Sequence, residues 1–326
     1  MNTPLKLSLF GLGLAAVFAA SYGAGHLAGP APAAAPAGHQ STAHGGGHAA
    51  PTAQTGSVEV PGGLQVAQDG YRLQPLSTQL STDQPQPLRF RILGPDGNPV
   101  TAYTPTHDKD LHLIVVRRDL AGFQHVHPTL GAGGVWEVPV RAGAGAGQYR
   151  LFADFQPTGR DQGLTLGVDL PAPGTYQPAP LPDAARTASV DGYTVTLDGD
   201  LTPGTSSKLT LTVAKDGKPV TDLQPYLAAY GHLVALRDGD LAYLHVHPDG
   251  EPGDGRTPAG PQIVFHAEVP SAGAYRLFLD FQHNGVVRTA AFTAVAGPAA
   301  PAAPATAPAS AGPVPVPSPS HAHGGH

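Results

Sequence analysis

Two stretches of this 326-residue chain repeat a histidine pattern whose spacing suits a metal ion. The first is HLIVVRRDLAGFQHVHP, from His112 to Pro128, and the second is HLVALRDGDLAYLHVHP, from His232 to Pro248. The two histidines of His-Val-His share one face of a β-strand, because successive side chains alternate. If each stretch folds back as a hairpin, the leading histidine joins them and three imidazoles meet on one face. That is the arrangement of a metal site.

The second stretch predicts the register of this hairpin. Asp238-Gly239 is typical of a two-residue type I′ turn. Folding about that turn would place His232 opposite His245 and Tyr230 opposite His247. Directly opposed Cβ atoms lie about 4.5–5.5 Å apart. We therefore expect three histidines to crowd one end of one sheet face.

The same offset applied to the first stretch places His112 opposite His125 and Asp110 opposite His127. Its turn, RRDLAG, is less decisive, and a slip of one residue would move the partners to opposite faces. Further histidines lie nearby in the sequence at His107, His266 and His283. The predicted metal ligands are His112, His125, His127, Asp110, His232, His245, His247 and His266.

The composition limits which metal such a site could hold. The chain has 16 His, no Cys and a single Met at position 1. Imidazole suits Zn, Cu and Ni, whereas Cu(I) and blue-copper sites need sulfur ligands. We expect Cu(II), which binds tightest in this series, or else Zn(II). His-rich segments at both ends could add weaker sites; their histidines are His39, His44, His48, His321, His323 and His326.

Two other functions fit the same histidines. A His-x-His pair can simply be two hydrogen-bonded residues at a sheet margin, and duplication copies structural residues too. The chain would then be a non-catalytic envelope interaction or spacer module. GDLAYLHVHPDGE, ending at Glu251, also fits the opening of the cupin metalloenzyme pattern, but the rest of that pattern is missing. Hydrolase elbows and phosphate loops are absent as well, so we predict no catalytic activity.

The elements that must position these residues are predicted to be β-strands in two duplicated units. The two units contain similar segments: DGYRLQ and YRLFADFQ in the first correspond to DGYTVT and YRLFLDFQ in the second. Short runs with a period of two, separated by Gly, Pro, Asp and Asn turns, predict about seven strands per unit. We expect an all-β protein with two tandem antiparallel β-sandwiches of immunoglobulin or cupredoxin type, over residues 57–171 and 189–296.

The remaining segments predict export. Residues 1–26 hold Lys6 and then a mostly apolar run, typical of a signal peptide or uncleaved membrane anchor. Residues 27–56, 172–188 and 297–326 are rich in Ala, Pro and Gly and read as linkers or tail. A net charge of −6 gives no sign of nucleic-acid binding. The expected location is extracytoplasmic, secreted, periplasmic or anchored to the cell membrane by the N-terminus.

A signal segment followed by sandwich units with DGxPV turns and HVHP hairpins resembles bacterial extracytoplasmic YtkA-like and related immunoglobulin-like proteins. The residues that carry the resemblance are Asp96–Val100, His112–Pro128, Asp216–Val220 and His232–Pro248. Such proteins are often linked to heavy-metal handling. The resemblance implies a sandwich fold and a metal-related role outside the cytoplasm, with a metal ion as partner. It does not say which residues bind.

Overall fold

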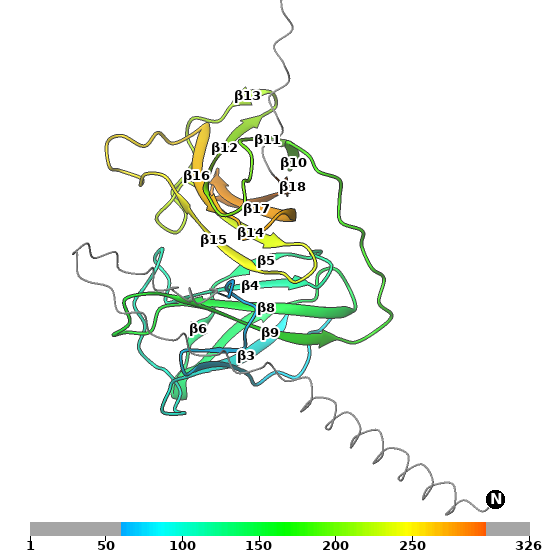
Figure 1. Ribbon diagram of the computed structural model, residues 1–326, viewed down its shortest axis with the longest axis vertical. Coiled ribbons are helices and arrows are strands. Elements are labelled where there is room, and N and C mark those ends of the chain that lie inside the picture. Colours follow the sequence, from blue (N-terminus) through cyan, green and yellow to red (C-terminus); the bar gives the residue numbers. More distant parts are fainter. Residues whose placement is uncertain (1–59, 298–326) are drawn as a thin grey trace, which may run out of the picture. The chain divides into compact units, whose positions relative to one another are not determined.

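The computed structural model describes residues 60–297, apart from the side chains of His245 and His247 (Figure 1). The described chain is all-β and folds into two tandem antiparallel β-sandwiches, as the sequence predicts. Within these residues no helix is long and apolar enough to cross a membrane. The predicted signal or anchor, the linker 27–56 and all but the first residue of the tail 297–326 lie outside the described residues.

The first repeat consists of two sheets, with strand orders β1-β2-β3-β7-β6 and β5-β4-β8-β9. A short 3-10 turn over Ala132–Gly134 precedes β7. The strands are β1 (Ala67–Gln68), β2 (Tyr71–Pro75), β3 (Gln86–Leu93), β4 (Leu111–Arg117), β5 (Gln124–Val126), β6 (Thr129–Leu130), β7 (Val135–Val140), β8 (Gly147–Phe155) and β9 (Leu164–Ala172).

The second repeat follows the same plan, with the order β10-β11-β12-β16-β15-β14-β17-β18 and β13 beside β12. Here one strand, β15, pairs with both β14 and β16 and so links the two layers. The strands are β10 (Thr187–Val190), β11 (Tyr193–Asp198), β12 (Ser206–Lys215), β13 (Lys218–Pro219), β14 (His232–Arg237), β15 (Tyr243–Pro248), β16 (Gln262–Glu268), β17 (Gly273–His283) and β18 (Val286–Ala296).

Most strands bury alternate residues, as the period of two in the sequence requires. In β3, Leu88, Phe90 and Ile92 are buried, and the residues between them are exposed or half-buried. The buried side chains of the two sheets meet in one apolar core per repeat. Each repeat therefore has the core that an independent sandwich needs.

The histidine-bearing strands β4 and β14 depart from this alternation, because both of their faces are covered. Leu113 and Val115 of β4 belong to the core of the first repeat. Ile114 belongs to a different apolar cluster, which it shares with Val234 and Phe278 of the second repeat. An antiparallel sheet that reads as apolar on both faces has a second surface packed against it. The outer faces of β4 and β14, which carry His112 and His232, thus line the contact between the repeats.

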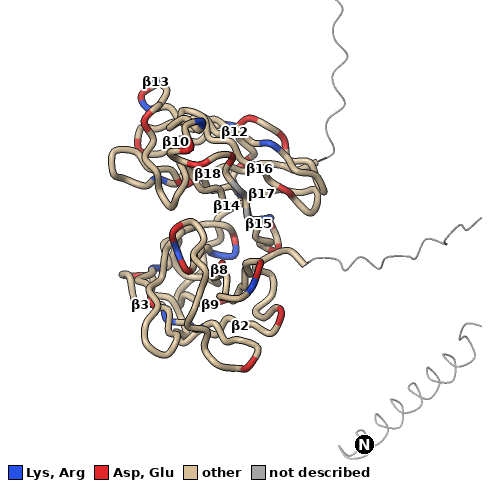
Figure 2. Tube along the Cα trace, turned by 90° about the vertical axis from the view of Figure 1, so that its left-hand side faces the viewer, with Lys and Arg blue, Asp and Glu red and all other residues tan. Residues whose placement is uncertain are grey.

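Charged side chains are scattered over the loops and strands of both repeats (Figure 2). Several arginines pair with carboxylates, among them Arg118 with Asp169 at 2.6 Å and Arg160 with Asp69 at 2.9 Å. The net charge of the chain is −6, and these ion pairs bring opposite charges together without changing it. That the protein binds no nucleic acid stays a prediction.

Trp136 anchors the core of the first repeat. It is 1% exposed, and its indole Nε1–H donates to the Tyr103 hydroxyl at 3.1 Å. We expect Trp136→Ala to lower the free energy of unfolding by about 3–5 kcal/mol, because it leaves a large cavity. The measurement is urea unfolding followed by far-UV circular dichroism, since this is the single tryptophan. Trp136→Phe should cost less, and equal stability of the Ala variant would contradict the assignment.

Candidate metal centre

The register of the histidine hairpins differs from the prediction by two residues. In the first hairpin Ile114, not His112, lies opposite His125. In the second, Val234 lies opposite His245. The predicted facing pairs, including Asp110 with His127, are therefore wrong. Because the shift is an even number, His112, His125 and His127 of the first hairpin keep the shared face that the sequence predicts.

The physical reason lies in the loop that closes each hairpin. Asp238-Gly239 does not form a type I′ turn, because only Gly239 of the pair has positive φ. The loop instead runs from Arg237 to Ala242, whose carbonyl accepts the Arg237 amide at 3.1 Å. The Asp240 carboxylate ties it together by binding the Arg237 guanidinium and the Ala242 amide. The loop is two residues longer than the predicted two-residue turn, so the register of strand pairing shifts by two residues.

A tight turn before β4 supplies a fixed hydrogen-bond acceptor for His112. Thr106 and Lys109 exchange backbone hydrogen bonds, and the residues between them, His107 and Asp108, both have positive φ. The turn presents the Thr106 carbonyl oxygen 2.9 Å from His112 Nε2. A carbonyl only accepts, so Nε2 carries the hydrogen and Nδ1 of His112 carries the lone pair.

The second repeat contains the same kind of turn, with a carbonyl oxygen that accepts a hydrogen bond from its leading histidine. Tyr226 and Ala229 exchange backbone hydrogen bonds around two residues with positive φ. His232 Nε2 donates to the Tyr226 carbonyl oxygen at 2.8 Å. The orientation of the leading histidine is therefore a shared property of both repeats.

Three ring nitrogens of the first repeat converge at one point. His112 Nδ1 lies 3.1 Å from His125 Nε2 and 3.2 Å from His127 Nε2. The ligand atoms of all three residues lie within 4.8 Å of one another. Zinc–nitrogen bonds of about 2.0–2.1 Å at tetrahedral angles would separate ligand nitrogens by about 3.3 Å. The two distances from His112 Nδ1 are close to this value.

The protonation pattern makes this convergence unusual. His125 Nδ1 lies 2.8 Å from a carboxylate oxygen of Asp280, so this nitrogen carries the hydrogen. In their neutral forms, His112 and His125 therefore turn lone pairs toward each other across 3.1 Å. If His127 Nε2 carries a hydrogen, it can donate to His112 Nδ1. The contact between His112 Nδ1 and His125 Nε2 still lacks a hydrogen. A proton or a cation between the two rings removes the repulsion.

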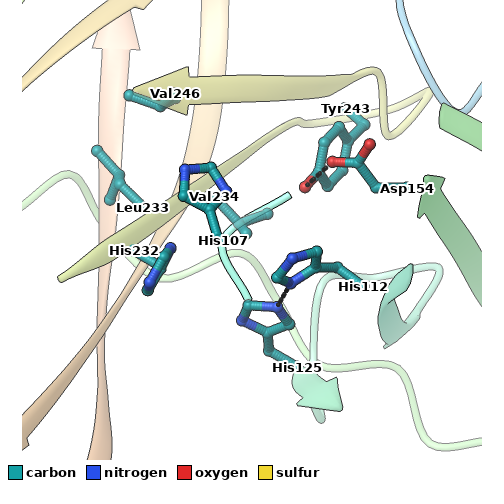
Figure 3. A pocket seen from close by; sticks show the side chains of 9 residues that line it. All are labelled: His107, His112, His125, Asp154, His232, Leu233, Val234, Tyr243 and Val246. Carbon is teal, nitrogen blue, oxygen red and sulfur yellow. Dashed lines mark hydrogen bonds between the residues drawn. The ribbon is translucent and has the colours of Figure 1, made fainter. Parts of the chain in front are cut away.

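Figure 3 shows that four imidazoles surround a small cavity beside this point. The rings of His107 and His232 have centroids 5.2 Å apart, and those of His112 and His125 are 5.3 Å apart. The cavity has a volume of about 30 Å³. One or two water molecules fit such a space, and it is far smaller than the several hundred Å³ of a typical ligand pocket. The site can hold an ion and its water but not an organic substrate.

Not every predicted ligand joins this cluster. Asp110 and His266 are exposed, and His266 lies on β16. His283 is buried elsewhere, between the Tyr193 hydroxyl at 2.7 Å and an Asp222 carboxylate oxygen at 3.1 Å. The side chains of His245 and His247 lie outside the described residues, so their role stays a prediction.

Asp280 is the site residue that the sequence analysis missed. The sequence places it in the duplicated stretch YRLFLDFQ, where a strand residue at the sheet margin would be unremarkable. In the structure it is 3% exposed and lies opposite His232 in the pairing of β14 with β17. A carboxylate directly after the apolar run Leu277–Leu279 was the available signal, because buried charges need partners.

The comparison with protein families matches both repeats. A family model described as a domain of unknown function, DUF8832, covers residues 65–173 and again residues 188–297. The chain belongs to the DUF8832 family. Among curated proteins, none matches its sequence.

The DUF8832 chain also resembles solved structures built from immunoglobulin-like domains. The Escherichia coli adhesin FdeC is 15% identical with a TM-score of 0.25, over 70% of this chain and 65% of that one. Invasin, a bacterial integrin-binding protein, is 11% identical with a TM-score of 0.19, over 69% and 39% of the two chains. The chain thus spans less than two thirds of either. The likeness concerns the fold alone, and the link to YtkA-like proteins stays a prediction.

Burial holds three histidines of the DUF8832 chain, His112, His127 and His232, neutral at pH 7. Burial lowers the pKa of His112 to about 4 and that of His232 to about 4, and burial with the neighbouring His125 lowers the pKa of His127 to about 3. Neutral imidazole is the form that binds metals.

These pKa values predict that the metal-free protein loses stability in acid. Between pH 6.5 and 4 these three histidines take up protons in the unfolded chain but not in the folded one, so the free energy of unfolding falls as pH falls. Urea unfolding at a series of pH values would measure this. His112→Gln should flatten the profile and the exposed His266→Gln should not; an unchanged profile for His112→Gln would contradict the assignment.

Proposed function

We propose that this protein is an extracytoplasmic, non-catalytic metal-binding protein that holds a divalent transition metal at His112, His125 and His127. The observation that carries the proposal is the 3.1 Å contact between His112 Nδ1 and His125 Nε2, two ring nitrogens whose opposite nitrogens each face an oxygen acceptor. A cation placed between these two nitrogens would form one bond with each of them.

The chemistry of the ligands supports Cu(II) or Zn(II). All three are borderline imidazoles, and the chain has no Cys that would favour a soft ion such as Cu(I). The carboxylate on the outer nitrogen of His125 is the usual outer partner of a metal-bound histidine. Metal binding at such a site serves sequestration or delivery rather than catalysis, because the cavity of about 30 Å³ leaves no room for an organic substrate.

The proposed location and the His-rich ends extend this role. The apolar run after Lys6 supports export, whether as a cleaved signal or as a membrane anchor. The histidine-rich segments at the two ends of the chain would capture ions weakly, and the buried cluster would hold them. The proposed partners are thus a metal ion and, if the signal is retained, the membrane.

The test is metal retention by a chain that cannot bind through its ends. The histidines outside the described residues are replaced by Gln: His26, His39, His44, His48, His321, His323 and His326. After loading with Cu²⁺ or Zn²⁺ and desalting, we expect at least one ion per chain by elemental analysis. Retention below 0.1 ion per chain, on the order of background, would refute the proposal.

A second candidate is a non-catalytic interaction or spacer module of the cell envelope. Its support is the tandem of two immunoglobulin-like sandwiches with a shared apolar contact, an architecture that needs no metal. The same loading experiment separates the two functions, because a spacer retains no ion.

A further inference from the structure

One outer contact of the histidine cluster, that of His125, comes from the other repeat. His125 lies on β5 of the first repeat and Asp280 on β17 of the second, 155 positions apart, with their side chains 2.8 Å apart. Both are almost sealed from solvent, with side chains 6% and 4% exposed. The second carboxylate oxygen of Asp280 accepts the Thr289 hydroxyl at 2.5 Å. The carboxylate is therefore held in place from its own repeat and aimed at the first.

An aromatic contact lies beside this pair, between Phe123, just before β5, and Phe278 of β17. The rings of Phe123 and Phe278 are stacked, with centroids 3.9 Å apart and planes at 7°. Phe278 precedes Asp280 by two residues on β17, so their side chains share a strand face, and Phe123 precedes His125 by two residues in the chain. Around them lies the apolar cluster formed by both repeats. The His–Asp contact is thus part of the repeat interface and is shielded by it.

Charge balance gives Asp280 a function. Three neutral imidazoles leave the two positive charges of a bound ion uncompensated in a buried place, which is costly. Asp280 supplies a negative charge one imidazole away from the ion. It also holds the hydrogen of His125 on Nδ1 and so directs the Nε2 lone pair inward.

We infer that the metal site is shared between the two repeats, with Asp280 of the second repeat as the positioning residue for His125 of the first. The inference rests on the proposed function. It adds that the ion is bound tightly only when the two sandwiches are in contact, and that binding in turn strengthens this contact, because the coupling of two equilibria is reciprocal.

The experiment measures Zn²⁺ affinity by competition with a chromophoric chelator, in the full chain with its end histidines replaced. Asp280→Asn keeps the shape and removes the charge. We expect the affinity to fall about 10–100-fold, the usual loss for an outer partner of a metal ligand. The visible absorption of bound Co²⁺ should also change, since a repositioned His125 alters the ligand field; a merely structural loss of stability would leave that spectrum as it is.

The matched control is Asp222→Asn. Asp222 also pairs with a histidine, His283, at 3.1 Å, but outside the cluster. Its loss should leave affinity and spectrum unchanged. A second variant, Phe278→Leu, weakens the interface and leaves every histidine and Asp280 in place. Shared binding predicts a measurable loss of affinity here too, which keeps the test valid if Asp280→Asn fails to fold.

The outcomes separate this inference from the proposed function. If the parent chain binds and both variants bind equally well, the site belongs to the first repeat alone; the inference is overturned and the metal function stands. If the parent chain binds no ion, both are overturned.

Discussion

A chain carrying His125→Ala together with His127→Ala is expected to lose one tightly bound ion. The substitutions leave His112 as the single remaining member of the three converging nitrogens, and one imidazole cannot hold an ion against solvent. The loss of affinity should exceed the about 10–100-fold that an outer partner costs. Elemental analysis after Zn²⁺ loading and desalting would measure it, in the chain with its end histidines replaced.

The control is His266→Ala, which removes an exposed histidine of β16. It should retain the parental metal content. The pair His245→Ala and His247→Ala asks the same question of the second hairpin, and a further loss of one ion would show that each repeat contributes a site. Full retention after loss of His125 and His127 would contradict the assignment of the cluster.

Zn²⁺ is expected to stabilise the folded protein strongly. The three nitrogens converge only in the native state, because β4 and β5 bring together residues 13 to 15 positions apart. At a free ion concentration of 100 Kd, a ligand that binds only the native state adds about 2.7 kcal/mol to the free energy of unfolding. If residues 60–297 unfold as one unit, that corresponds to a rise in Tm of about 5–10 °C.

Differential scanning calorimetry with and without Zn²⁺ would measure this rise. The end histidines must again be replaced, since they would bind the ion in the unfolded state and mask the effect. The variant lacking His125 and His127 should show no rise. An equal rise in that variant, or a fall in Tm for the parent chain, would refute native-state binding by the cluster.

Much of the site was predictable from local patterns. The repeated His-x-His indicates two histidines on one face, and the duplicated period-two runs indicate two sandwiches. Both follow from short-range geometry, since alternation along a strand holds whatever the strand pairs with. His112, His125 and His127 were thereby identified together before their exact partners across the hairpin were known.

The predicted register of the hairpins was wrong because it rested on a single dipeptide, Asp238-Gly239, as the turn. Asp238-Gly239 favours a type I′ turn, but Arg237 and Asp240 form an ion pair that closes a longer loop. The energy of that pair depends on side chains meeting in three dimensions. The candidate set survived because a shift of two residues preserves the face.

The sequence by itself determined the all-β class, the duplication and the three histidines that share a face. Only the tertiary structure decided that both faces of β4 and β14 are covered, that the Thr106 carbonyl orients His112, and that Asp280 reaches His125 from the other repeat. The physical reason is the distance along the chain over which each feature is determined. The alternation of side chains in a strand depends on neighbouring residues. The contact between His125 and Asp280, 155 positions apart, exists only once both cores have formed and packed together.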